Sequence, residues 1–379
     1  MLAAAGSRRL RVQTLTPTLT LDTLRRYALA RSLFKPTTLP RAIERLGFVQ
    51  ADPMRAPARA QDLILLQRVK GYRAGDLERR YPRLAVEEDC LVNYGFLPRQ
   101  HLTLLHPRTA RQAWDEGTAA RAAELLDFIR ARGHTHPREV LEAFDHGLVP
   151  GYWGGTLNAS TQLLDGMHYR GLLRVVRRDS GTRVYAAVRH APADDDGPAA
   201  RRARAERLLD LVVALYAPLP AASLGYLTSL LGYGAPHLRA ETRAVQKAAR
   251  QRYGHARVEG QDWFWPADEN PLSRRHAPHE RLRLLAPFDP VVWDRRRFAL
   301  FWGWTYKFEA YTPAAQRRMG HYALPLLWGE QIPGWANLSV DAQGRLRHEL
   351  GFAGPRPKGP LFRAALEEAL EEMRQFLRL

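Results

Sequence analysis

A glutamine and an aspartate lie two positions apart in the stretch "GFVQADPMRAPARAQD", which begins at residue 47. In an extended segment, residues i and i+2 point to the same side, so Gln50 and Asp52 would face one space. A carboxylate can stabilise positive charge and accept a proton from water, while an amide can orient that water. Such a pair suits release of a nucleobase from its sugar, which passes through a cation-like sugar ring. The same residues also fit a plain strand end, because Pro53 stops the strand.

Other catalytic and metal-binding patterns are weak in this sequence. His134 lies near His136, and His276 near His279, but neither pair has a third ligand at metal-binding spacing. A glycine-rich phosphate loop and a Gly-x-Ser-x-Gly elbow are both missing. Cys90 is the single cysteine, and its acidic setting "EEDCLVNYG" would raise the thiol pKa rather than activate it. We therefore expect neither a metal nor a cofactor.

The pair lies in a predicted first winged-helix-like domain, residues 21–110, which would position the site. An apolar stripe from Leu21 predicts one helix, and "LPRAIERLGF" predicts another, with Thr38 as N-cap and Gly47 as stop. Residues 111–190 show three helical patterns followed by two alternating strands around Ser180 and Gly181, which is typical of a winged helix.

The remaining chain divides into a linker, a third unit and an aromatic-rich end. Residues 191–203 are rich in Ala, Asp and Pro and read as a linker, and residues 204–270 repeat the winged-helix pattern. Residues 280–379 combine short alternating runs with a final amphipathic helix, which indicates a small β-barrel or sheet. Residues 1–20 read as a disordered tail or an over-long start. The predicted fold is α+β and mostly α: tandem winged-helix (helix-turn-helix) domains followed by a C-terminal β-barrel or sheet.

The charge of the chain favours nucleic acid as a partner. Lys and Arg total 57 against 39 for Asp and Glu, a net charge of +18 that comes mostly from arginine. Arginine binds phosphate bidentately and stacks on bases, although an Arg-rich genome would give a similar composition. The single cysteine and the lack of a long apolar run predict a cytoplasmic, nucleoid-associated protein without membrane contact.

The third helix of the 204–270 unit carries two separate stripes. Leu238, Thr242, Val245 and Ala249 form an apolar stripe that can dock on the domain. The basic stripe that would face DNA consists of Arg239, Arg243, Lys247 and Arg250. A solvated surface is the alternative. Further DNA contacts are expected from Arg55, Arg59, Arg177 and Arg178. The C-terminal aromatics fit a core better than a base-stacking platform.

The stretch "LGFVQADPMRAPARAQDLILLQRV" resembles the winged-helix DNA glycosylases of the YcaQ/AlkZ type, whose signature is Gln-x-Gln or Gln-x-Asp. Gln50-Ala51-Asp52 matches the second form. "LLAPFDPVVWDRRRFALFWGWTYKFEAYTPAAQRRMGHYALPLLWGEQIPGWANL" is similar to the C-terminal block of the family, so the resemblance extends over nearly the whole chain after about Thr20. One departure lies downstream: the family's "ERAHH" is "ARAQD" here, with Ala58, Gln61 and Asp62 at the altered positions.

The resemblance implies a monofunctional DNA glycosylase that hydrolyses the N-glycosidic bond of bulky N7- or N3-alkylated purines, including interstrand crosslinks. Asp52 would stabilise the sugar cation and polarise the water, and Gln50 would position the water. Double-stranded DNA with alkylated or crosslinked bases would be the partner of a monomeric enzyme. The alternative is a non-enzymatic winged-helix DNA-binding protein, either a regulator or an architectural protein, in which Gln50 and Asp52 have no chemical role.

Overall fold

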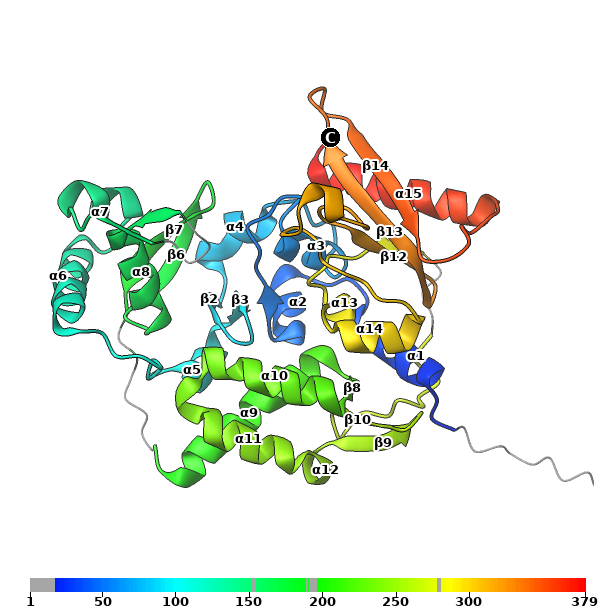
Figure 1. The fold of residues 1–379 in the computed structure, drawn as a ribbon, viewed down its shortest axis with the longest axis horizontal. Helices are drawn as coiled ribbons and strands as arrows, with labels where there is room; N and C mark the ends of the chain where they lie inside the picture. Colours follow the sequence, from blue (N-terminus) through cyan, green and yellow to red (C-terminus); the bar gives the residue numbers. More distant parts are fainter. Residues whose placement is uncertain (1–17, 151–154, 189, 191–195, 278–280) are drawn as a thin grey trace, which may run out of the picture.

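Figure 1 shows the computed structural model of the chain, which describes residues 18–150, 155–188, 190, 196–277 and 281–379. Helices make up 46% and strands 20% of the structure, which confirms the expected α+β, mostly helical class. The predicted tail over residues 1–20 falls almost entirely outside the described ranges, as does His279.

The first unit combines short helices with a three-stranded antiparallel sheet. The chain turns out of its second helix at Gly47, whose φ of 71° is the left-handed conformation that glycine favours, and enters the first strand at once. The strand order is β1-β3-β2. The elements are α1 (Leu21–Ser32), α2 (Leu39–Leu46), β1 (Val49–Gln50), α3 (Ala60–Leu66), α4 (Asp76–Arg80), β2 (Val86–Cys90), β3 (Tyr94–Pro98) and α5 (Leu102–Leu105).

The second unit, at the left of Figure 1, ends in the predicted hairpin. Ser180 and Gly181 both have positive φ, 52° and 91°, as a tight two-residue hairpin turn requires. The elements are α6 (Glu116–Arg132), α7 (Pro137–Ala143), β4 (Leu148–Pro150), β5 (Thr156–Asn158), α8 (Ala159–Tyr169), β6 (Leu173–Asp179) and β7 (Thr182–Ala187).

The third unit, along the lower edge of Figure 1, repeats an order of helices followed by a hairpin. Its first helix begins at Pro198, within the range predicted as a linker. The elements are α9 (Pro198–Tyr216), β8 (Leu219–Pro220), α10 (Ala221–Gly234), α11 (Arg239–Lys247), α12 (Ala249–Arg252), β9 (Gly254–Val258) and β10 (Gln261–Trp265).

Of the two alternatives predicted for the C-terminal part, the sheet is confirmed and the barrel is wrong, because the strands form an open antiparallel sheet in the order β11-β12-β13-β14. The sheet buries a face against a helix instead of closing on itself: the rings of Trp328 and Phe352 lie 5.3 and 6.3 Å from that of Phe362. The elements are β11 (Leu282–Leu284), α13 (Pro290–Trp293), α14 (Arg295–Trp302), β12 (Leu324–Trp328), β13 (Gln331–Val340), β14 (Leu346–Phe352) and α15 (Pro360–Leu377).

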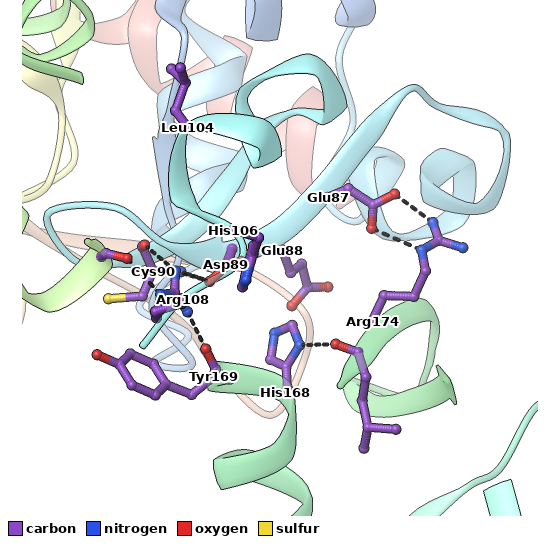
Figure 2. Close-up of polar contacts among 12 residues, drawn as sticks. Glu87, Glu88, Asp89, Cys90, Leu104, His106, Arg108, His168, Tyr169 and Arg174 are labelled. Carbon is purple, nitrogen blue, oxygen red and sulfur yellow. Dashed lines mark hydrogen bonds and ion pairs between the residues drawn. The ribbon is translucent and has the colours of Figure 1, made fainter. Parts of the chain in front are cut away.

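A buried polar network joins β2 to the second unit (Figure 2). Burial alone would raise the pKa of the Asp89 carboxyl, but the neighbouring Arg108 and His106 outweigh it and hold the pKa well below its usual range. Two arginines of β6, Arg174 and Arg178, bind Glu87 and Glu88 and so fix β6 beside β2. Three consecutive carboxylates of β2 accept from basic side chains: Glu87 from Arg174 (2.6 Å), Glu88 from Arg178 (2.5 Å), and Asp89 from His106 (2.6 Å) and Arg108 (2.8 Å).

Candidate active site

A cleft of about 820 Å³ opens where the first unit, the second unit and the C-terminal part of the chain meet. Gln50 and Asp52 lie in one wall, the β6–β7 hairpin and α8 form a second, and aromatic rings from the C-terminal part form a third. The described residues that line it are Gln50, Ala51, Asp52, Pro53, Arg59, Gln61, Asn93, Tyr94, Pro137, Thr161, Asp165, Arg178, Gly181, Thr182, Arg183, Tyr185, Phe288, Phe308 and Tyr311.

The close pairing of β1 with β3 sets the position of the Gln-x-Asp pair. Gln50 lies opposite Gly95 in this register, and the Ala51 N–H donates to the Tyr94 carbonyl at 3.0 Å, which extends the pairing toward Asp52. A Cβ at Gly95 would lie only 2.4 Å from the Val49 carbonyl oxygen. Only glycine therefore lets the strands approach this closely and bring both side chains to the cleft wall.

Asp52 is 9% exposed, and protein groups satisfy only part of the hydrogen-bonding capacity of its carboxylate. Its Oδ1 accepts from the Met54 N–H at 2.9 Å, whereas Oδ2 has no hydrogen bond to any described residue. Burial raises the pKa of Asp52, and the Met54 N–H offsets part of that rise. The carboxylate is therefore a better proton acceptor than a solvated aspartate, with one oxygen free for a ligand.

Both glutamines of the site have their carbonyl oxygens held by protein N–H groups. Gln50, which is 4% exposed, accepts from the indole Nε1 of Trp293 at 2.8 Å. Gln61 is also buried and accepts from the backbone N–H of Asp52 at 3.2 Å. Gln61, which is one of the three positions that differ from the family pattern, thus stabilises the backbone of Asp52.

The other two departures lie outside the cleft lining. Asp62 is buried and accepts from the Tyr72 hydroxyl at 2.7 Å and from the Gly75 N–H at 3.0 Å, which gives it a structural role in the first unit. Burial raises the pKa of the Asp62 carboxyl. Ala58 is buried in the core. Among the altered residues, only Gln61 touches the candidate active site.

Several predicted DNA-binding arginines are paired with acids in this structure. Arg59 pairs with Glu78 and Arg178 with Glu88, and both arginines line the cleft. Arg55 is exposed, and no described acidic residue pairs with it. The contact of these predicted arginines with DNA stays a prediction. The other paired arginines are Arg177, which meets Asp179 at 3.0 Å, and Arg250, which meets Asp262 at 2.5 Å.

Two stripes run along α11 and its immediate flanks, and their burial differs as the spacing predicts. The apolar stripe is buried, and it consists of Leu238, Thr242, Val245 and Ala249. Arg239, Arg243 and Lys247, which we call the exposed α11 cations, have no acidic partner among the described residues. In Figure 1 α11 lies below α10, and none of its residues lines the cleft. Any DNA contact of α11 would therefore be remote from Asp52, and it remains a prediction.

Metal and thiol chemistry gain no support from the structure. No group of three His, Cys, Asp or Glu side chains within the described ranges could hold a metal ion. Burial raises the pKa of the Cys90 thiol to about 11, in the direction that its surroundings predict. In the part of the chain that the structure describes, each helix is too short or too polar to cross a membrane.

Sequence reasoning missed the C-terminal aromatic residues that reach the Gln-x-Asp wall. Trp293, Phe288, Phe308 and Tyr311 contact or face the Gln-x-Asp wall from more than 200 positions away. Their only sequence signal is the aromatic richness of residues 280–379, which also describes an ordinary core. Asp165 in α8 lines the cleft as well and carries no distinguishing pattern.

Comparison with known proteins identifies the family of the chain. The family model of the AlkZ-like DNA glycosylases matches residues 43–376, which include both the Gln-x-Asp wall and the aromatic wall. The fold is similar to that of the Streptomyces sahachiroi DNA glycosylase AlkZ, with 12% sequence identity, a TM-score of 0.58, and coverage of 95% of this chain and 97% of that one. Because this is a family of DNA glycosylases, the alternative of a non-enzymatic DNA-binding protein has no support. The chain belongs to the AlkZ-like DNA glycosylase family.

Proposed function

We propose that this DNA glycosylase is monofunctional, that it hydrolyses the N-glycosidic bond of bulky N7- or N3-alkylated purines in duplex DNA, and that Gln50 and Asp52 perform the reaction. The carrying observation is that Gln50, at the end of β1, and Asp52, two residues further on, share the wall of one large cleft. Interstrand crosslinks through the same purine nitrogens belong to the proposed substrates.

The proposed reaction needs one carboxylate and one water. An alkylated purine is cationic, so it leaves with the electron pair of the bond to C1′ without strong acid help. The positive charge that develops on the sugar is stabilised by the Asp52 carboxylate. The water oxygen bonds to C1′, and its proton passes to Asp52, whose raised pKa suits a proton acceptor. The products are the neutral base and an abasic site.

The lining of the cleft supports both the mechanism and a bulky substrate. No lysine is among the described lining residues, so none there is placed to form a Schiff base, in accord with hydrolysis by water. Phe288, Phe308 and the 74% exposed Tyr311 offer ring faces on which a planar adduct can stack. A cleft of about 820 Å³ has room for a base with a large substituent.

The same proposal includes the DNA partner and the role of the helical units. The repeated order of helices followed by a hairpin supports tandem winged helices that place basic surfaces on duplex DNA. The net charge of +18 supports binding to the phosphates of DNA. The proposal further includes a monomer that associates with the nucleoid in the cytoplasm.

The test incubates the protein with duplexes containing an N7-alkylguanine or a nitrogen-mustard crosslink and measures released base and abasic sites. We expect base release without a borohydride-trapped protein–DNA adduct, because water is the nucleophile. Intact binding with no release from any alkylated duplex would refute the substrate assignment. A trapped covalent adduct would refute the hydrolytic mechanism.

A further inference from the structure

The contact between Trp293 and Gln50 determines which way the Gln50 amide faces. The indole Nε1–H can only donate, so the atom that it meets at 2.8 Å is the amide oxygen. The opposite orientation would set two donors against each other. The Gln50 Nε2 has no hydrogen bond to any described residue, although its side chain lines the cleft. Gln50 therefore presents its N–H groups, and not its carbonyl, to a ligand.

We propose that Trp293 is a positioning residue of the glycosylase reaction, and that it fixes Gln50 as a hydrogen-bond donor to the oxygen of the attacking water. This inference rests on the proposed function. The water then donates one proton to Asp52 while it accepts a hydrogen bond from Gln50, which aims its remaining lone pair at C1′. A carbonyl in the same place would instead compete with Asp52 for the proton of the water.

The indole is held in place by a buried ion pair between distant parts of the chain. Trp293 is the last residue of α13, and Asp289 caps that helix by accepting from the Val291 N–H at 3.0 Å. The Asp289 carboxylate also binds Arg68 of the first unit through two hydrogen bonds of 2.7 and 2.9 Å, and both side chains are 0% exposed. The short helix is thereby fixed to the unit that carries Gln50.

The third unit contributes to the same positioning through ring packing. The Trp293 ring lies 5.0 Å from that of Tyr216 in α9 and 6.1 Å from that of Tyr226 in α10. These ring contacts restrict the position of the indole from the third unit. A unit that supplies none of the described cleft-lining residues therefore still helps to set the hydrogen-bonding direction inside the cleft.

The central test compares Trp293→Phe with Trp302→Phe in single-turnover base release from an N7-alkylguanine duplex. Phenylalanine keeps a ring and removes only the N–H donor, and Trp302 is a matched control because its Nε1 donates at 2.9 Å to a backbone carbonyl, that of Glu330. We expect Trp293→Phe to lower the rate about tenfold, the scale of one lost positioning hydrogen bond, with unchanged affinity for the duplex. Equal rates for wild type and both variants would overturn the proposal.

Two further variants separate positioning from a structural effect. In a Gln50→Ala background, Trp293→Phe should lower the rate no further, because Trp293 acts through Gln50. Independent, multiplicative losses would contradict that route. Gln50→Glu keeps an acceptor for the indole and removes the N–H donors, so it should be as slow as Gln50→Ala. A rate close to wild type for Gln50→Glu would refute the donor role.

The contact can also be tested without turnover. In the ¹⁵N spectrum of the tryptophan indoles, the resonance missing from Trp293→Phe identifies Trp293. Gln50→Leu should shift that resonance and speed its exchange with solvent. An unchanged resonance would refute the contact even if the enzyme is active. A shifted resonance in a protein that releases no base would refute the proposed function and leave the contact standing.

Discussion

The buried pair of Arg68 and Asp289 provides a demanding test of how the site is assembled. Asp289→Asn keeps the shape of the side chain and its ability to cap α13, but it removes the negative charge beside Arg68. The guanidinium would remain 0% exposed with three other acceptors: the Ser32 carbonyl (3.0 Å), the Ser32 hydroxyl (3.1 Å) and the Ile64 carbonyl (2.8 Å).

The expected loss of stability follows from that uncompensated charge. Removing one partner of a fully buried pair destabilises a protein by roughly 3–5 kcal/mol. The remaining neutral acceptors satisfy hydrogen bonds but not the charge, so we expect a loss of at least about 3 kcal/mol for Asp289→Asn. Glycosylase activity should also fall, because α13 carries Trp293.

The assay is urea unfolding followed by tryptophan fluorescence, with base release measured on the same preparations. Asp127→Asn is the control, because it breaks an exposed ion pair with Arg130 that spans one turn of α6. It should leave both stability and activity close to wild type. An Asp289→Asn protein within about 1 kcal/mol of wild type, well below the buried-pair range, would refute the argument.

Three other outcomes are expected. The rate of base release should fall as the solution is acidified through the raised pKa of Asp52, because protonation removes the proton acceptor. The midpoint of this fall in rate should lie above the pKa of a solvated aspartate, and a rate that does not change with pH would contradict the role of Asp52. Gly95→Ala should lower the stability of the fold by about 1–3 kcal/mol and impair base release, since the new Cβ would meet the Val49 carbonyl. Unchanged activity and stability would contradict the conclusion that the close approach of β1 to β3 requires glycine. Replacing the exposed α11 cations by alanine should reduce the slope of log Kobs against log salt by about 2.7, at about 0.9 per phosphate contact; an unchanged slope would exclude α11 from the DNA interface.

Local features of the fold were largely predictable from the sequence. Gly47 ends α2, the β6–β7 hairpin turns at Ser180 and Gly181, and the apolar stripe of α11 is buried, because each depends on periodicity or on turn conformation within a few residues. The sequence left open whether the C-terminal strands form a barrel or a sheet, since strand patterns do not reveal whether a helix such as α15 covers one face of the open sheet.

The Gln-x-Asp wall of the site was also predictable, but its partners were not. Gln50 and Asp52 lie two positions apart in an extended segment, so their common direction follows from local geometry. Trp293 meets Gln50 across 243 positions, and the paired state of Arg178 depends on Glu88, 90 positions away. Neither contact leaves a pattern in a single sequence, because each arises from how separate units pack.

The most direct test of the central claim is the single-turnover rate of base release from an N7-alkylguanine duplex by wild type and by Asp52→Asn. The change removes the charge and the proton acceptor while keeping the side chain's size. We expect the rate to fall by roughly 10²–10⁴-fold with duplex binding retained. Equal rates for the two proteins would remove Asp52 from the mechanism and contradict the account of the site.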